Sequence, residues 1–219
     1  MDLGLTAMVA GSGWASGVNV YATIAVLGVL GRLDIGPVPT VLQRTDVIVI
    51  AVVLFALEFV ADKVPFLDSF WDAVHTVVRP VGAAVLGLIL SGDAENWQQA
   101  VSVLGAGGIA TAAHAAKATT RLAINSSPEP ASNIGVSLLE DGLVLAVVWF
   151  ALTNPLVAIG LVTVLLIGGG VLTVALFRVA RRVLRRRRGR HDRHADAAAA
   201  GATASADRPD PSQLRGGSR

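Results

Sequence analysis

The stretch HAAKATTRLAINSSPEPASN, residues 114–133, decides how this chain is organised. It follows the small-residue run VSVLGAGGIATAA and precedes the apolar run GLVLAVVWFAL. His114, Lys117 and Arg121 are separated by three and four positions, so a helix places them in one stripe along one face. Ionisable groups in apolar segments are costly and usually pair with one another. We therefore expect carboxylates, an anionic ligand, or both, beside this basic stripe.

The composition indicates an integral membrane protein. The 219 residues are 53% hydrophobic and 16% charged, and their mean hydropathy is +0.62. These values lie outside the usual range of soluble domains. The chain contains no cysteine, which excludes disulfides, thiolate metal sites and cysteine nucleophiles.

Six apolar segments are candidates for membrane helices, each close to the 20 residues that span a bilayer. The sequence thus predicts an all-α integral membrane protein with about six transmembrane helices, which form a bundle over residues 1–180. The first segment has no basic region before it and no credible cleavage site after it, so we expect a retained helix rather than a signal peptide. The six segments are residues 5–30, 46–62, 66–90, 97–122, 134–153 and 155–180.

The third segment leaves two interpretations open. Its first half, FLDSFWDAVHTVVR, is polar, and Pro80 separates it from the apolar VGAAVLGLIL. Ten helical residues extend only about 15 Å, half of a bilayer. The segment is either a kinked transmembrane helix or an interfacial helix followed by a re-entrant half-helix, which is tolerated where protein satisfies its backbone.

The chain also shows a weak internal similarity. The runs VAGSGWASGVNVYATIAVLGVLGR and VLGAGGIATAAHAAKATTRLAIN both begin with glycines and carry small residues on one face. Each precedes an apolar segment that has an acidic pair. This pattern suggests an inverted repeat of three plus three helices, as in many transporters.

The C-terminal tail carries most of the basic charge. From Arg178 onward there are 12 arginines and 4 acids, a balance of +8, while the preceding residues have a balance of −6. Arginines directly after an apolar run predict a cytoplasmic tail; together with the family resemblance given below, this implies a bacterial inner membrane. Six crossings then place both termini in the cytoplasm. We expect residues 181–219 to be basic and then low-complexity and disordered.

The tail and the size of the bundle suggest partners. The arginines are either an orientation signal alone or also a binding site for anionic lipid headgroups. Nucleic acid is not an expected partner. A bundle of about 180 residues is small for a lone transporter, which favours a homo-oligomer.

A second charged stripe precedes Pro80. Asp68, Asp72, His75 and Arg79 are separated by four, three and four positions, so they share one helix face. We expect the two stripes to face each other or a shared polar cavity, joined by further carboxylates and by one amide of the first segment. The candidate ligand-binding residues are Asn19, Glu58, Asp62, Asp68, Asp72, His75, Arg79, His114, Lys117, Arg121, Glu140 and Asp141.

Three functions fit these patterns. The first is a small transporter or lipid-handling protein whose intramembrane polar site takes an anionic ligand. The second is a non-catalytic scaffold in which salt bridges orient helices. The third is a membrane enzyme in which Asp62, Asp68 and Asp72 hold Mg²⁺ for a phosphorylated lipid, since hard cations prefer carboxylates. The sequence contains no serine triad, HExxH motif or phosphate-binding loop, so we assign no catalytic residue and expect no cofactor.

Four motifs together resemble one bacterial family of polytopic membrane proteins, domain-of-unknown-function family 4126. They are GWASGVNVYATIAVLGVLGR, LEFVADKVPFLDSFWDAVHTVVRP, HAAKATTRLAINSSPEPASN and SLLEDGL, and the similarity covers about residues 4–180. The resemblance implies a shared fold and carries no activity with it. The family-like positions that it indicates are Asn19, Tyr21, Glu58, Asp62, Lys63, Pro65, Asp68, Asp72, His75, Arg79, Pro80, His114, Lys117, Arg121, Asn125, Pro128, Glu129, Pro130, Asn133, Glu140 and Asp141.

Overall fold

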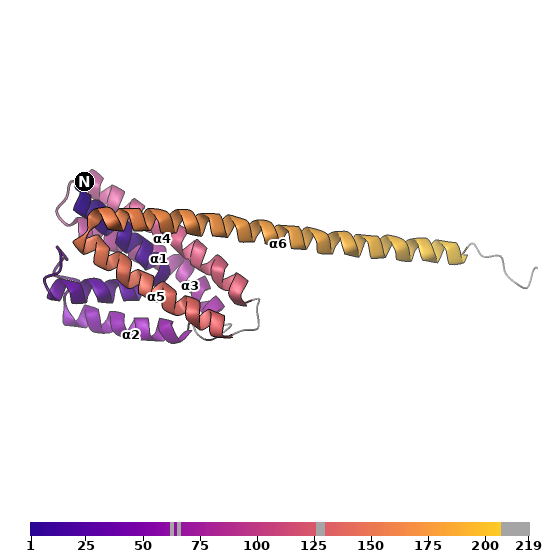
Figure 1. Cartoon of the computed structure of the whole chain (residues 1–219), viewed down its shortest axis with the longest axis horizontal. Coiled ribbons are helices and arrows are strands. Elements are labelled where there is room, and N and C mark those ends of the chain that lie inside the picture. The colour runs from indigo at the N-terminus through magenta and orange to yellow at the C-terminus, as the bar shows by residue number, and fades with distance from the viewer. Residues whose placement is uncertain (62–63, 65–66, 126–129, 207–219) are drawn as a thin grey trace, which may run out of the picture. The chain divides into compact units, whose positions relative to one another are not determined.

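The computed structural model describes residues 1–61, 64, 67–125 and 130–206, and over these residues its regular elements are all α-helices (Figure 1). Side chains are not described at residues 68–69, 125, 130–133 and 183–206. The predicted segments correspond to six helices with shifted ends. The helices are α1 Leu3–Arg32, α2 Thr45–Ala61, α3 Leu67–Ser91, α4 Asn96–Asn125, α5 Pro130–Thr153 and α6 Pro155–Ala206.

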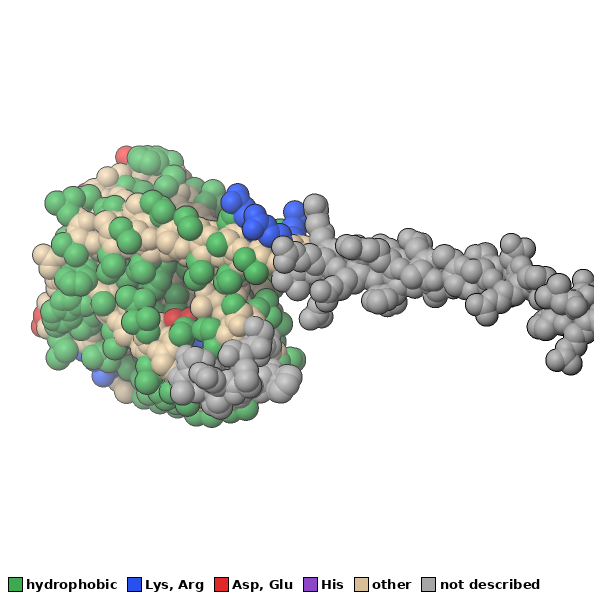
Figure 2. Space-filling view, turned by 45° about the vertical axis from the view of Figure 1, so that its right-hand side comes forward, with side chains coloured by type: hydrophobic (Ala, Val, Ile, Leu, Met, Phe, Trp, Pro, Cys, Tyr) green, Lys and Arg blue, Asp and Glu red, His purple; other side chains and the backbone are tan. Residues whose placement is uncertain are grey.

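The described helices have the character of membrane segments. Four of them contain stretches that are long and apolar enough to cross a bilayer: Leu3–Arg32, Phe70–Ser91, Ile134–Thr153 and Pro155–Arg182. The surface is rich in exposed large apolar side chains, such as Val53 on α2 and Val164 on α6, and hydrophobic side chains cover much of the face shown in Figure 2. In a soluble protein such patches are rare. The fold is therefore that of an all-helical membrane protein.

Helix α1 is broken at Asn19. The backbone there is extended, with φ −154° and ψ 99°, between two helical stretches. The Asn19 side chain accepts a hydrogen bond from the backbone N–H of Ala22 at 2.9 Å, and its carbonyl accepts one from the Thr23 hydroxyl at 2.8 Å. These are the contacts of an N-cap residue, which starts a new helix. Asn19 thus ends one helix and begins the next.

The second half of α1 returns toward the end of the bundle at which the first half began. Asp2 and Leu5, at the start of α1, line the same hollow as Pro37, which follows its end. We call this side, where α3 ends and α4 begins, the first end of the bundle; the second end is where α2 and α4 end. Between the two ends of α1, just after the break at Asn19, the Tyr21 hydroxyl lies 3.3 Å from the His75 ring on α3. Helix α1 is therefore a re-entrant helical hairpin at the centre of the bundle (Figure 1).

Small residues allow this hairpin to pack against its neighbours. A Cβ atom at Gly17 would lie 2.8 Å from the Cα atom of Ala110 and would also overlap the carbonyl oxygen of that residue. Gly13 approaches the backbone of Ala106 in the same way, with a Cβ contact of 2.9 Å. Close approach of small residues is the usual means of packing helices within lipid. The Gly13–Gly17 pair therefore sets α1 against α4.

The sequence predicts six full membrane crossings, whereas the structure has a reversal of direction within the first segment. The count included residues 5–30 as one crossing, but the break at Asn19 returns that segment to its starting end. The chain reverses direction within the first segment, whereas α3 is one continuous helix through Pro80. The number of membrane crossings stays a prediction. No break like that of α1 is recorded in the described residues of α4, so the inverted repeat stays a prediction.

The C-terminal segment is helical as far as Ala206, and alanine and arginine, which are frequent there, are both strong helix formers. The chain divides into two units, Met1–Val174 and Ala175–Arg219. The boundary between a bundle and a tail at residues 180–181 stays a prediction. The remainder of the tail, from residue 207, lies outside the described residues.

The path of α1 predicts the accessibility of two aspartates. The chain has no cysteine, so Asp2→Cys and Asp34→Cys can each carry the single thiol. In sealed vesicles both thiols should react with a membrane-impermeant maleimide from the same side, and Val64→Cys, which follows α2, should react from the opposite side. Labelling of positions 2 and 34 from opposite sides would show that α1 crosses the membrane.

Candidate functional site

Six buried or nearly buried charged side chains form one alternating row, which we call the charge chain. It runs from Asp72 and Arg79 on α3, through Glu58 on α2 and Lys117 on α4, to Glu140 on α5 and Arg121 on α4. Each carboxylate is followed by a cation, so four helices are joined by ion pairs. The nitrogen–oxygen distances along this row are 3.0, 2.6, 3.9, 3.9 and 2.8 Å.

Arg79 is the tightest link of the charge chain. Its guanidinium donates to Glu58 at 2.6 Å and to Asp72 at 3.0 Å. It also donates to Nδ1 of His114 at 2.7 Å. Arg79 and Glu58 are both fully buried. The fork of the guanidinium suits several acceptors at once, which explains why arginine can occupy this position without solvent.

The hydrogen bond from Arg79 determines the protonation state of the His114 imidazole. An arginine has only donors, so Nδ1 of His114 must be an acceptor and the ring is neutral. Its Nε2 atom then donates to the Thr76 hydroxyl at 3.1 Å, and that hydroxyl donates to the backbone carbonyl of Asp72 at 3.0 Å. His114 is therefore an ordering element of the network and adds no charge to it.

Lys117 joins the charge chain to the break in α1. Its ammonium group donates to the backbone carbonyl of Val18 at 3.1 Å and lies 3.9 Å from both Glu58 and Glu140. The carbonyl is available because the non-helical backbone of Asn19 interrupts the helix. A cation at the C-terminal end of a helix also interacts favourably with the helix dipole. Lys117 thus stabilises the first half of α1 at its end.

His75 connects the returning half of α1 to α3. Its Nε2 atom lies 3.3 Å from the Tyr21 hydroxyl, and its Nδ1 atom lies 2.8 Å from the Trp71 carbonyl. The imidazole stacks on the Trp71 ring, with centroids 5.0 Å apart. His75 belongs to the same polar interior as the charge chain and holds the tip of the α1 hairpin.

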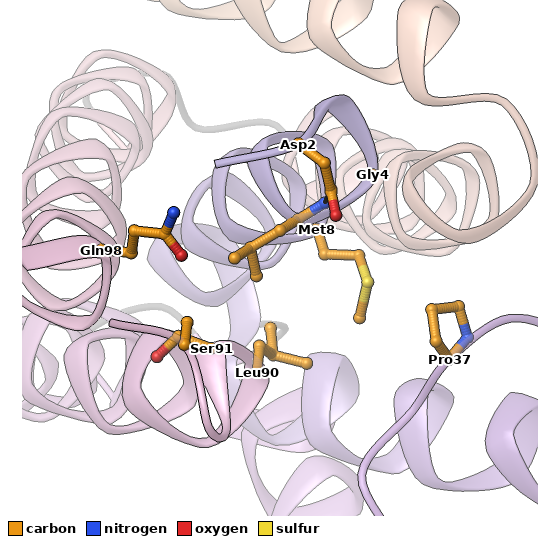
Figure 3. Close-up of a pocket in the computed structure, with 9 residues that line it drawn as sticks. Asp2, Gly4, Met8, Pro37, Leu90, Ser91 and Gln98 are labelled. Carbon is orange, nitrogen blue, oxygen red and sulfur yellow. Dashed lines mark hydrogen bonds between the residues drawn. The ribbon is translucent and has the colours of Figure 1, made fainter. Parts of the chain in front are cut away.

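Two hollows lie at opposite ends of the bundle. At the first end a hollow of about 470 Å³ lies between the two termini of α1, the end of α3 and the start of α4; Figure 3 shows Asp2, Met8, Pro37 and Gln98 around it. At the second end a smaller hollow of about 160 Å³ is lined by Asp72, Thr76 and Arg121, among others. The second hollow reaches the charge chain itself.

The structure brings most of the predicted site residues together. Eight of them meet in or beside the charge chain: Glu58, Asp72, His75, Arg79, His114, Lys117, Arg121 and Glu140. Asn19 lies at the α1 break, and Asp141, next to Glu140, has a buried carboxylate oxygen. Asp62 and the side chain of Asp68 lie outside the described residues.

Two participants were not identified from the sequence: the Val18 carbonyl, which accepts from Lys117, and Thr76, which lies beside His114. Ser12, Ser16, Asn19 and Thr23 are all buried, and their spacing of four, three and four could have indicated a polar stripe on the first helix. The Val18 carbonyl could not be found in this way, because its role depends on the broken backbone.

The fold and the buried ion pairs define a class, the all-helical membrane proteins with a charged interior. Within that class the chain belongs to a family whose model matches residues 6–176 and is described as Domain of unknown function (DUF4126). This match agrees with the resemblance of the four motifs. Neither the search of curated proteins nor that of solved structures gave a match.

The charge chain predicts a large loss of stability when Arg79 is removed. Arg79→Met leaves Glu58 and Asp72 without their shared cation, and breaking a buried ion pair typically costs about 3–5 kcal/mol. The variant should unfold at a markedly lower temperature in detergent. Arg44→Gln is the control, because Arg44 pairs with Asp46 at the surface, where ion pairs contribute little. Equal melting temperatures for the two variants would contradict the assignment.

Proposed function

We propose that this protein is a small bacterial inner-membrane transporter, or a lipid-handling protein, whose intramembrane site takes an anionic ligand at the charge chain. The observation that carries the proposal is that the charge chain contacts the break in α1, where Lys117 donates to the Val18 carbonyl. Ionisable groups within membrane segments usually mark a path for substrates or ions. A scaffold would need neither a broken central helix nor hollows at both ends.

The discontinuous helix is the feature most typical of transporters. In many of them the substrate lies near the bilayer midplane, where an interrupted helix offers its free backbone groups. Here the interruption at Asn19 faces Lys117 through the Val18 carbonyl. The hollows at the two ends of the bundle have no lining residue in common, which suits an occluded state of a transport cycle.

An anionic ligand can bind at this site by replacing a carboxylate as the partner of Lys117. The two contacts of Lys117 to Glu58 and Glu140 are the longest in the charge chain, at 3.9 Å each. An incoming carboxylate or phosphate would take a place beside Lys117 and loosen these contacts. Arg121, which lines the hollow at the second end, would be the first cation that a ligand meets from that side.

The orientation follows from the tail. Within the first unit α6 begins beside the first end, and the chain then continues into the arginine-rich segment. If positive residues mark the cytoplasm, the second end is cytoplasmic. The hollow at the first end is then the outer mouth, and the N-terminus lies outside. The sequence-based expectation that both termini are cytoplasmic depends on six crossings; with the reversal in α1 we propose instead that only the C-terminus is cytoplasmic.

The two other functions make different predictions. A scaffold requires only that the ion pairs stabilise the fold. A metal-dependent enzyme requires carboxylates that are able to hold Mg²⁺, but Asp72 already bonds Arg79 at 3.0 Å. No group of three metal-binding side chains occurs in the part of the chain that the structure describes. Neither alternative uses the break in α1.

Mass spectrometry of the purified protein tests the proposal. Wild type, Lys117→Gln and Arg44→Gln would be purified in mild detergent, and the small molecules and lipids that remain bound would be identified. We expect wild type and Arg44→Gln to retain the same anionic species, which a folded Lys117→Gln variant should lose at least tenfold. The same bound species at the same level in all three proteins would favour the scaffold.

A further inference from the structure

Glu58 has one carboxylate oxygen without a hydrogen-bond donor. Its Oε1 atom accepts from Arg79 at 2.6 Å and lies 3.9 Å from Lys117. Its Oε2 atom is buried and has no partner among the described residues. The whole residue is inaccessible to solvent. An unpaired oxygen of this kind is costly in a medium of low dielectric constant, and a bound proton would lower that cost by making the group neutral.

The six charges of the charge chain are balanced before any ligand binds. The charge chain contains three cations and three carboxylates, so the charges of these six residues sum to zero. Adding an anionic ligand gives this region an excess of negative charge away from water. Isolated charge in such surroundings costs several kcal/mol. Ligand entry is therefore favourable only if a positive charge enters too.

We propose that Glu58 is a proton-binding site, and that it takes up one proton when an anionic ligand occupies Lys117. This inference rests on the proposed function and names its coupling ion. The proton comes from the aqueous side with the ligand and binds to Oε2 of Glu58, which becomes a neutral carboxylic acid. No bond other than this O–H bond forms, and the proton leaves when the ligand leaves. The protein is then a symporter of an anion and a proton.

Glu58 fits this role better than its neighbours. Glu140 has a side chain that is 15% exposed and is held by Arg121 at 2.8 Å, and Asp72 lines the hollow at the second end. Both can be stabilised by water as carboxylates, whereas Glu58 depends wholly on its two cations. The charged and titratable groups around Glu58 are Tyr21 on α1, Asp72, His75 and Arg79 on α3, His114 and Lys117 on α4, and Glu140 on α5.

The coupling must be reciprocal. If the anion favours protonation of Glu58, a proton on Glu58 favours the anion by the same factor. The affinity for the ligand should then rise as the pH falls. The rise should be about tenfold per pH unit over the range in which Glu58 is ionised in the free protein and protonated in the complex with the ligand. A Glu58→Gln variant carries a permanently neutral side chain, so its ligand affinity should not depend on pH in this way.

The proposal can be tested without knowing the ligand. Lys117→Gln removes one positive charge, which has the same electrostatic effect on Glu58 as adding an anion beside Lys117. Infrared spectra at neutral pH, with isotope-labelled glutamate, would report the carbonyl stretch of a protonated carboxyl group. We expect about one additional protonated glutamate per chain in Lys117→Gln and none in Lys117→Arg, which keeps the charge. The signal should disappear in Lys117→Gln/Glu58→Gln.

Each outcome of the infrared experiment either supports or overturns the protonation of Glu58. A new protonated glutamate that survives the Glu58→Gln substitution would place the proton on another carboxylate and overturn the proposal, as would its absence in Lys117→Gln. If Lys117→Gln fails to fold, Lys117→Met keeps the length of the side chain without an unpaired amide and gives the same comparison. A negative result here leaves the mass-spectrometric test of ligand binding unaffected, so the two proposals can fail separately.

Discussion

The structure depends on one constraint, the need to neutralise six charges that are buried or nearly buried. Each of them would be prohibitively costly alone in a lipid bilayer, and pairing in strict alternation is the arrangement that satisfies all six. Because Glu58, Arg79, Lys117 and Glu140 come from four different helices, the alternation also fixes how those helices lie. The charge chain is therefore a polar core of the bundle beside its apolar clusters.

The break in α1 is part of the same arrangement. A helix that ends inside a membrane protein exposes carbonyl groups that need a donor. Lys117 supplies that donor to the Val18 carbonyl, and Asn19 caps the helix that follows. The hairpin and the charge chain therefore stabilise each other. A ligand that moved Lys117 would weaken the end of the first half of α1, which gives the protein a physical means of linking occupancy to the conformation of its central helix.

Most of the helices and most of the charged site could be predicted from the sequence. Apolar length located all six helices within a few residues, except for the extension of α6, and helical spacing found both charged stripes before their partners were visible. The reason is that the cost of buried charge leaves a strong local pattern, such as the spacing of Asp72, His75 and Arg79.

Two features could not be predicted. The motif SGVNVYAT reads as part of an apolar helix, and its break at Asn19 is stabilised by Lys117, which lies almost a hundred residues later. The sequence also could not decide whether α3 continues through Pro80, because a proline removes one backbone hydrogen bond and usually kinks a helix. Here the carbonyl of Pro80 packs toward Gly107, where a Cβ atom would lie 3.4 Å away, and the close contact of α4 supports the helix along that side.

The most direct test of this account is the environment of the Lys117 ammonium group in a bilayer. The chain has only two lysines, so Lys63→Gln leaves Lys117 as the single site for ¹⁵N-labelled lysine, and the carboxyl carbons of glutamate can be labelled with ¹³C. Solid-state NMR should then show dipolar coupling between the Lys117 nitrogen and glutamate carboxyl carbons, reduced by Glu58→Gln and reduced again by Glu140→Gln. A Lys117 nitrogen with no carboxyl carbon close to it would show that the charge chain does not exist.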